Sequence, residues 1–271
     1  MEPSNSPNPG AQSHLPGRAP KLLPGRVGAV AQDDIDESLR LLRAMQGDAD
    51  PGPLIRAYRP LPTVAFSRRE SLLPEFAAAS AAARGLGFDP VIRLAGGRAV
   101  AYDQTCLVVD LIAPLDLYSD PIAAFDTGAA CFRDLLRDLG IDARVGAVTG
   151  EYCAGNHSVN ARGQVKIVGI AQRTMRRARL LTASIVLESP ERLRPVIDAV
   201  YAAMNLEWSS ASLGSLRDEG LHLSPDEMAN ELVTGLQQRH IGWSRPQKAL
   251  VLCLSSVENA VDHGQMGTFG P

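Results

Sequence analysis

The chain has 271 residues, and its 27 Lys and Arg against 30 Asp and Glu give a formal net charge of −3. This near-neutral balance argues against a nucleic acid partner, because broad phosphate binding needs a clear excess of Lys and Arg. The hydrophobic fraction of 45% is enough to build a core. Uncharged apolar runs such as Ala249–Val257 are shorter than the about 20 residues that cross a bilayer. With no recognisable secretory signal, these features predict a soluble, cytoplasmic protein with no membrane partner.

The four cysteines stand at positions 106, 131, 153 and 253, and no two of them form a C-x-x-C pair. The histidines also lack the i, i+4 spacing of many zinc ligands, so we predict no metal site. A disulfide framework is not expected in a chain without an export signal. Cys106, Cys131 and Cys253 have apolar neighbours, and we interpret them as small buried hydrophobic residues.

Residues 1–26 contain six prolines and no aromatic side chain, so we predict a disordered tail there. Beyond the tail, hydrophobic periodicity predicts both helices and strands. The expected helices cover 33–45, 75–84, 122–139, 190–204 and 224–238, and the expected extended runs cover 54–58, 63–67, 91–94, 98–102, 107–112, 165–173 and 180–187. Because these elements do not follow a regular βαβ rhythm, we expect an α+β (α/β) fold with a mixed β-sheet flanked by helices. We place a single domain at 27–263 and a short tail at 264–271.

A pair of glycines lies between two predicted strands, in the run R-L-A-G-G-R-A-V-A-Y-D over 93–103. Gly96 and Gly97 let the backbone approach a ligand closely and adopt dihedral angles that are closed to other residues. Exposed N–H groups there could bind a carboxylate or a phosphate, with Arg93 or Arg98 supplying charge. Taken alone, the same pattern also fits an ordinary hairpin turn.

The second motif is the run N-A-R-G-Q-V-K-I-V-G-I-A-Q-R over 160–173. Lys166 has apolar neighbours in the predicted strand, and Gly169 leaves space nearby. Lys166 is therefore either an exposed edge-strand charge that limits aggregation or a group directed at an anionic substrate. As an exposed lysine, it would contribute little to stability.

Together, the two motifs resemble the biotin/lipoate protein ligase and octanoyltransferase superfamily, roughly from Asp33 to Met204. The resemblance implies a mixed sheet flanked by helices, and attachment of an octanoyl or lipoyl group to one lysine of a lipoyl domain or a glycine-cleavage H protein. The catalytic lysine of that family maps onto Lys166, so the resemblance implies that the ammonium of Lys166 orients the acyl carbonyl. The substrate-binding residues map onto Arg93, Gly96, Gly97, Arg98, Ala99, Tyr102, Asp103, Gly169, Ala171 and Gln172. The family usually has histidine at the position of Tyr102.

Two chemistries share the fold of this superfamily. Ligases make an acyl-adenylate from ATP and magnesium, whereas octanoyltransferases take the acyl group from a carrier thioester, such as acyl carrier protein, onto a cysteine. The resemblance favours transfer, because the run at 96–100 lacks a third glycine and residues 104–106 lack the asparagine-bearing segment of ligases. We therefore expect no tightly bound cofactor, with ATP and magnesium required only by a ligase. A non-catalytic protein that binds lipoyl or biotinyl groups is a further alternative.

Cys153 is the predicted nucleophile, because one branch of octanoyltransferases carries its cysteine in the loop before the lysine strand. A nearby ammonium such as that of Lys166 favours the thiolate that this chemistry needs. His157 is an alternative base for the reaction. As an ordinary loop residue, Cys153 would have no such role.

A basic turn follows the second motif, with arginines at 173, 176, 177 and 179. Such a turn is typical of a solvated hairpin tip. A basic tip beside the active strand could also steer an acidic acceptor domain towards the site. No function is predicted for the residues from Ser209 onwards.

Overall fold

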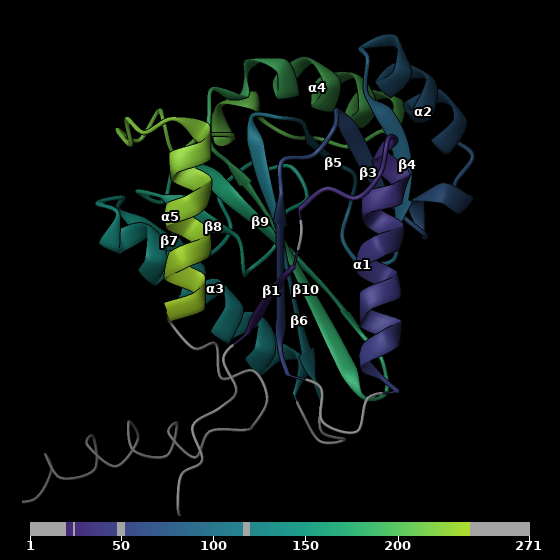
Figure 1. Ribbon diagram of the computed structural model, residues 1–271. Helices are drawn as coiled ribbons and strands as arrows, with labels where there is room; N and C mark the ends of the chain where they lie inside the picture. Colours follow the sequence, from purple (N-terminus) through teal and green to yellow (C-terminus); the bar gives the residue numbers. More distant parts are fainter. Residues whose placement is uncertain (1–19, 24, 48–51, 116–119, 239–271) are drawn as a thin grey trace, which may run out of the picture.

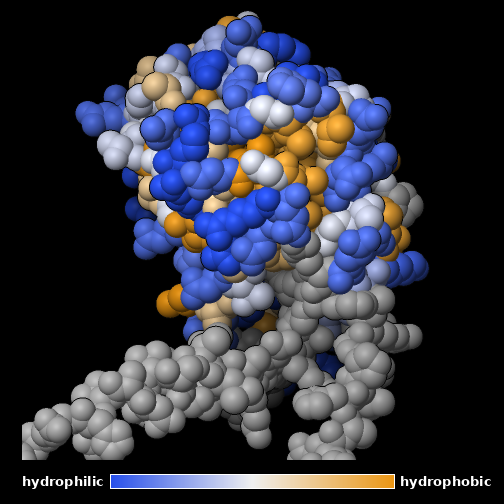
Figure 2. Space-filling model, turned by 90° about the vertical axis from the view of Figure 1, so that its left-hand side faces the viewer, coloured by the Kyte–Doolittle hydropathy of each residue, from blue (hydrophilic) through white to orange (hydrophobic). Residues whose placement is uncertain are grey.

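The computed structural model describes residues 20–23, 25–47, 52–115 and 120–238. Two sheets form the centre of this part of the chain, and helices cover them (Figure 1). On the face seen in Figure 2, which is the left-hand side of Figure 1, hydrophilic side chains surround a patch of hydrophobic ones. No helix in the described ranges is long and apolar enough to cross a membrane.

The larger sheet has seven strands in the order β1-β2-β6-β10-β9-β8-β7. These strands are β1 (Lys21–Leu23), β2 (Leu54–Tyr58), β6 (Cys106–Pro114), β10 (Ala178–Val186), β9 (Val165–Thr174), β8 (Val159–Ala161) and β7 (Ala143–Val145). β1 pairs with β2 in parallel, whereas the other neighbours are antiparallel. The long strands β6, β9 and β10 form its centre because their side chains are apolar on the buried faces.

The smaller sheet has the order β4-β3-β5, with β4 at Asp89–Arg93, β3 at Thr63–Ser67 and β5 at Val100–Tyr102. β3 is parallel to β4 and antiparallel to β5. The predicted glycine pair therefore lies in the connection between the two outer strands, β4 and β5. This connection is not a hairpin turn, because β3 separates the strands that it joins.

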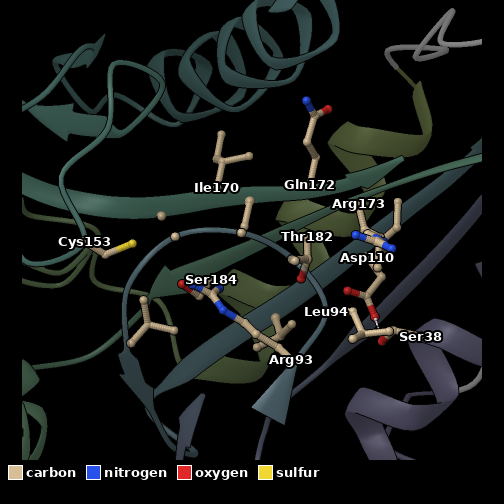
Figure 3. Close-up of a pocket in the computed structure, with 18 of the residues that line it drawn as sticks. Ser38, Arg93, Leu94, Asp110, Cys153, Ile170, Gln172, Arg173, Thr182 and Ser184 are labelled. Carbon is tan, nitrogen blue, oxygen red and sulfur yellow. Dashed lines mark hydrogen bonds between the residues drawn. The ribbon is translucent and has the colours of Figure 1, made fainter. Parts of the chain in front are cut away.

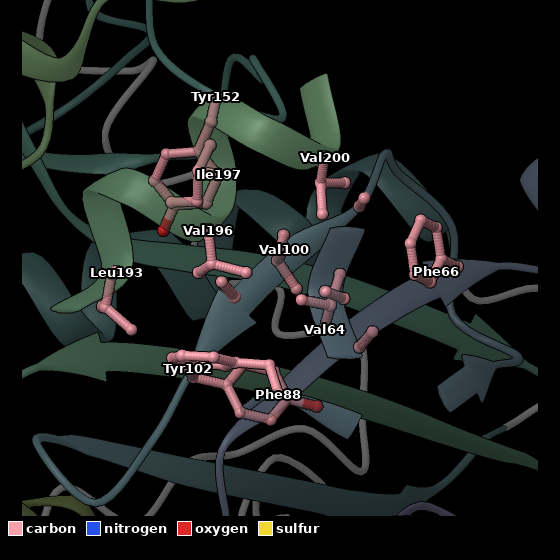
Figure 4. Packing of buried hydrophobic residues seen from close by; sticks show 14 of the residues in the cluster. Val64, Phe66, Phe88, Val100, Tyr102, Tyr152, Leu193, Val196, Ile197 and Val200 are labelled. Carbon is pink, nitrogen blue, oxygen red and sulfur yellow. The ribbon is translucent and has the colours of Figure 1, made fainter. Parts of the chain in front are cut away.

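The helices cover the two sheets in separate groups, and each group has its own core. The helices are α1 (Ala31–Met45), α2 (Phe76–Gly85), α3 (Pro121–Asp138), α4 (Leu193–Ala203) and α5 (Pro225–Gln238), with short 3₁₀ turns at Glu70–Leu72, Pro190–Arg192 and Ser210–Ser212. α2 and α4 pack with the smaller sheet around a cluster that includes Phe66, Val100 and Val196 (Figure 4). α3 and α5 cover one face of the larger sheet, and α1 packs against β6 and β10.

The predicted α+β fold with a mixed sheet flanked by helices is confirmed, and each predicted helix and strand is present with bounds shifted by a few residues. The predicted tail is wrong at its end, because Lys21–Leu23 form β1 and the Lys21 amide donates to the carbonyl of Pro53. β1, β7 and β8 escape prediction because three residues carry no measurable periodicity. The rest of the tail over 1–19 and everything after 238, Cys253 and the tail at 264–271 included, lie outside the described residues.

A buried charge cluster joins α1 to the larger sheet. The guanidinium of Arg56 on β2 pairs with Asp34 on α1 and, at 3.3 Å, with Asp110 on β6. Ser38 donates a hydrogen bond to the same Asp110 carboxylate. All four side chains are buried, and burial raises the pKa of Asp110. Because two carboxylates depend on one cation, Arg56 is needed to compensate their desolvation.

We expect Arg56→Met to lower the free energy of unfolding by about 3–5 kcal/mol, because Asp34 and Asp110 would remain buried without a counter-charge. Urea denaturation followed by circular dichroism measures this change. Arg144→Met is the matched control, since Arg144 pairs with Asp142 on the surface and its loss should leave stability almost unchanged. Equal effects of the two substitutions would contradict the role of the buried cluster.

Candidate active site

A cavity of about 410 Å³ lies between the two sheets. Its walls come from α1, the β4–β5 connection, the loop before β8, and the strands β9 and β10. Figure 3 shows Cys153 near one end of this cavity and the pair Asp110–Ser38 near the other, with Arg93 and Thr182 between them. The two motifs found in the sequence therefore face one another across a single space.

Lys166 lies in the wall of the cavity at the start of β9, and its ammonium is surrounded by protein acceptors. Its Nζ donates to the carbonyl oxygens of Cys153 at 2.9 Å and Tyr152 at 3.1 Å, and lies 3.4 Å from Glu151 Oε1. Lys166 is only 2% exposed, so the prediction of an exposed edge-strand charge is wrong. Burial lowers the pKa of this ammonium, and the Glu151 carboxylate offsets part of that effect.

Glu151 holds the loop that contains Cys153. Its Oε1 accepts hydrogen bonds from the Gly155 amide at 2.9 Å and the Ser158 hydroxyl at 2.7 Å, and its Oε2 accepts from the Val148 amide at 3.1 Å. One buried carboxylate thus joins residues on both sides of the loop to the ammonium of Lys166. These hydrogen bonds define the conformation of the loop, because they give its backbone donors and acceptors specific partners.

Cys153 adopts a left-handed backbone conformation with φ of 45°, which is uncommon for a residue with a side chain. Its amide donates to the Tyr201 hydroxyl at 2.7 Å, and that hydroxyl donates to the carbonyl of Ala99 at 3.2 Å. Its Sγ accepts a hydrogen bond from the Arg98 amide at 3.2 Å. Two separate bridges therefore connect the cysteine loop with the glycine loop.

Gly97 is required where the two loops approach each other. Its φ is 98°, and a Cβ at this position would lie 2.9 Å from Cys153 Sγ and 3.0 Å from Arg93 Nη2. The positive φ disfavours any residue with a side chain, and a side chain here would displace Cys153 or Arg93. Gly96, by contrast, has no atom within 4 Å of such a Cβ. The close approach therefore depends on the second glycine of the pair.

The structure brings most of the predicted site residues to the cavity but not all of them. Those that line it are Arg93, Gly96, Gly97, Tyr102, Cys153, Lys166, Gly169, Ala171 and Gln172. Arg98 and Ala99 contribute their backbones to the supporting loop, where the Ala99 amide donates to Glu70 at 2.8 Å. Asp103 is buried away from the lining, accepts hydrogen bonds from Thr105 and lies 3.3 Å from Arg192.

The other predictions for single residues have mixed outcomes. Cys106 is buried as predicted, and burial raises the pKa of its thiol to about 12. Cys131 is half-buried and packs against the core beneath the larger sheet. His157 lines the cavity, but its Nε2 lies 3.0 Å from Asp126 and its ring stacks on Phe125. The imidazole is thus held by α3.

Sequence reasoning missed several residues that shape the site. Ser38, Tyr58, Asp110 and Thr182 line the cavity, and Glu70, Glu151 and Tyr201 hold its loops. Glu151 stands close to Cys153 in the chain, so its acidic side chain in an otherwise uncharged loop is a usable signal. The others come from distant elements, and their sequence surroundings resemble ordinary surface or core positions. In the part of the chain that the structure describes, no group of three or more His, Cys, Asp or Glu could hold a metal.

Comparison with known proteins identifies the family. The family model for the lipoyl protein ligase A/B catalytic domain matches residues 35–236. The chain belongs to the lipoyl protein ligase A/B catalytic domain family. The predicted resemblance to the biotin/lipoate ligase and octanoyltransferase superfamily is therefore confirmed.

Relatives of this family member include two named octanoyl-[GcvH]:protein N-octanoyltransferases. The protein from Exiguobacterium sibiricum is 30% identical over 128 residues, which are 47% of this chain and 46% of the relative. The one from Oceanobacillus iheyensis is 27% identical over 152 residues, which are 55% of this chain and 52% of the relative. The chain thus spans about half the length of the curated relatives it matches.

Solved structures of lipoate-protein ligases share the fold. A lipoate protein ligase from Thermoplasma acidophilum with bound lipoic acid has a TM-score of 0.63 and 22% identity, and the match covers 82% of this chain and 86% of that one. A lipoate-protein ligase A bound with ATP has a TM-score of 0.64 and 20% identity, over 89% of this chain and 95% of that one. At these identities the similarity supports the fold.

We expect Gly97→Ala to abolish binding of an acyl ligand, because the added methyl group would collide with Cys153 Sγ and Arg93. Calorimetry with octanoate measures the loss. Gly140→Ala is the matched control, since Gly140 has a φ of 88° with no atom within 4 Å of an added Cβ. Both variants should lose on the order of 1 kcal/mol of stability from backbone strain, the collision adds to this loss in Gly97→Ala, and only Gly97→Ala should lose binding. Normal octanoate affinity in Gly97→Ala would show that the close approach does not serve the ligand.

Proposed function

We propose that this protein transfers an octanoyl or lipoyl group to one lysine of a lipoyl domain or a glycine-cleavage H protein, through a thioester on Cys153. The observation that carries the proposal is the position of the Cys153 sulfur, which lies in the cavity wall and accepts the Arg98 amide N–H. The similarity to named octanoyl-[GcvH]:protein N-octanoyltransferases supports the same substrate class. A cysteine thiolate is a sufficient protein nucleophile for the transfer of an acyl group from a carrier thioester.

The proposed reaction has two acyl transfers. The Cys153 thiolate adds to the carbonyl carbon of a carrier thioester, such as octanoyl acyl carrier protein, and the carrier thiolate leaves and takes up a proton. The amine of the acceptor lysine then adds to the Cys153 thioester, an amide bond forms, and Cys153 leaves as thiolate while the amine loses a proton to solvent. No ATP, metal or tightly bound cofactor takes part in either step.

In this proposal Lys166 acts mainly by holding the nucleophile in place, and not by the predicted orientation of the acyl carbonyl, because its Nζ already has three protein acceptors. Its N–H groups bind the carbonyls of Tyr152 and Cys153, so the lysine determines where the Cys153 loop lies. Its location in the cavity wall also brings its positive charge close to the acyl group. The further predicted contacts of Gly169, Ala171 and Gln172 with the acyl chain follow from their positions along β9.

The basic turn lies beside the cavity. Arg173 lines it, and Arg176 and Arg177 are exposed at the tip between β9 and β10, whereas Arg179 is buried. We propose that the three exposed arginines attract an acidic acceptor domain towards the opening, because opposite charges steer association at long range.

Cys153→Ser distinguishes transfer from ligation. The assay is acylation of a purified lipoyl domain by each protein, supplied either with octanoyl acyl carrier protein or with free lipoate, ATP and magnesium. We expect wild type to act with the carrier donor and to show a mass increase of one octanoyl group on the Cys153 peptide, and Cys153→Ser to lose this activity because a serine hydroxyl does not ionise near neutral pH.

Full activity of Cys153→Ser with lipoate and ATP would instead assign the protein to ATP-dependent ligation through lipoyl-AMP. If wild type acylates the lipoyl domain with neither donor, the result would indicate a non-catalytic protein that binds lipoyl or biotinyl groups. Cys131→Ser is the control for a half-buried thiol outside the cavity and should keep wild-type activity.

A pair of variants tests the role of Lys166. We expect Lys166→Met to abolish transfer and also to destabilise the fold, because the Glu151 carboxylate would stay buried without its cation. The double variant Lys166→Met/Glu151→Gln removes that uncompensated charge but keeps only one acceptor oxygen at position 151, so it should regain part of the stability in urea denaturation but not transfer activity. Recovery of transfer in the double variant would show that Lys166 is needed only for folding.

A further inference from the structure

We infer that Arg93 binds the carbonyl oxygen of the acyl group and stabilises the negative charge that develops on this oxygen during transfer. The inference rests on the proposed function for the reaction at Cys153. It assigns to Arg93 a chemical role in the reaction, whereas Lys166 is assigned to position the loop.

The guanidinium of Arg93 is a buried cation with few partners. Arg93 is 9% exposed and lines the cavity. Its Nη2 donates to the carbonyl of Arg98 at 2.9 Å, and its Nε is buried with no hydrogen-bond partner in the described residues. No carboxylate of the described chain forms an ion pair with it. Burial of a guanidinium without a counter-charge is energetically unfavourable. An anionic or strongly polarised ligand beside Arg93 would therefore be bound favourably.

The same guanidinium lies beside the proposed nucleophile. Arg93 Nη2 and Cys153 Sγ are both within 3.0 Å of the point that a Cβ of Gly97 would occupy. No more than about 6 Å therefore separates Nη2 from Sγ, so the carbonyl oxygen of an acyl group joined to Sγ comes within reach of the guanidinium donors. Figure 3 shows the Arg93 side chain extending into the cavity on the side of Ser184 and Cys153. Gly97 therefore allows the sulfur and the guanidinium to lie close together, because a side chain at this position would displace both of them.

Lys166 is poorly placed for this task in comparison. Its three N–H groups have three protein acceptors, the carbonyls of Tyr152 and Cys153 and the Glu151 carboxylate. Its charge is thus matched by Glu151, whereas the charge of Arg93 is not matched. The Arg98 amide is also occupied, because it donates to the sulfur itself. Among these groups, the guanidinium has unused donors next to the sulfur.

The chemistry of each transfer step requires such a donor. When the Cys153 thiolate adds to the carrier thioester, the C=O electron pair moves onto oxygen and creates an oxyanion. The oxyanion collapses when the carrier thiolate leaves. A second oxyanion forms and collapses when the acceptor amine attacks. A preorganised cation at this oxygen stabilises both transition states.

The first experiment measures binding and does not depend on catalysis. Calorimetry compares octanoate binding to wild type, Arg93→Met and Arg93→Lys, with Arg84→Met on the exposed face of α2 as the control. We expect Arg93→Met to lose at least about tenfold in affinity, because a charged hydrogen bond to the carboxylate is lost. Arg93→Lys should recover part of this loss, and Arg84→Met should bind like wild type. Unchanged affinity in a folded Arg93→Met protein would overturn the inference.

The second experiment measures the rate at which the Cys153 thioester forms from octanoyl acyl carrier protein in a single turnover. It is read on the plateau of the pH–rate profile, where a change in thiol ionisation no longer affects the rate. We expect Arg93→Met to lower this plateau by about 10²–10³-fold, the range found for loss of one oxyanion donor, with a smaller change in KM. A plateau equal to that of wild type would limit Arg93 to substrate binding and overturn its role in charge stabilisation.

The two experiments separate this inference from the proposed function. If wild type forms no thioester but its octanoate binding depends on Arg93, transfer through Cys153 is wrong and binding of the carbonyl oxygen by Arg93 stands. If wild type forms the thioester and Arg93→Met does so equally fast with equal octanoate affinity, the proposed function stands and the inference fails. Circular dichroism shows whether each variant is folded, and Arg93→Lys replaces Arg93→Met if the latter is not.

Discussion

The ammonium group of Lys166 is almost completely withdrawn from water, and the geometry of the site follows from how its charge is compensated. Its acceptors are Glu151 and the carbonyls of the next two residues, Tyr152 and Cys153. Because three consecutive residues must all face one ammonium, the loop has little conformational freedom. This requirement supports the left-handed backbone of Cys153, which would otherwise be unfavourable.

The second constraint is the close approach of two loops that belong to different sheets. Gly97 permits the approach because it has no Cβ, and the Tyr201 hydroxyl maintains it by bonding the Cys153 amide and the Ala99 carbonyl. On the other side, Glu70 accepts the Ala99 amide. The cavity is therefore rigid at the end where the sulfur lies. Such rigidity suits acyl transfer, because preorganised groups need no rearrangement as charge develops.

The sequence predicts the parts of this arrangement that depend on local pattern. The helix at 122–139 and the strands at 165–173 and 180–187 are long and periodic, and they lie within a few residues of α3, β9 and β10. The glycine pair is recognisable because only glycine combines such conformations with a close approach. The motif order also indicates Lys166 as a site residue.

The remaining features depend on tertiary contacts that no local pattern records. An exposed edge-strand charge is one of the two predictions for Lys166, yet the side chain is buried and Glu151 of the preceding loop lies against it. Tyr201 lies in a helix whose pattern indicates only an apolar face, and its hydroxyl gains a role from a loop 48 residues away in the chain. β1 needs the edge of β2 to exist as a strand. In each of these three cases, a residue or strand that is distant in the sequence determines what the residue or strand does in the structure.

Cys106 and Cys153 show how strongly the surroundings of a thiol determine its chemistry. Cys106 lies in the central strand β6, and burial raises the pKa of its thiol to about 12, so it stays protonated and inert at neutral pH. Cys153 lies in a loop at the cavity wall, where its sulfur accepts a backbone N–H and lies close to the unmatched charge of Arg93. The loop that compensates the charge of Lys166 thus also presents the sulfur beside the guanidinium of Arg93.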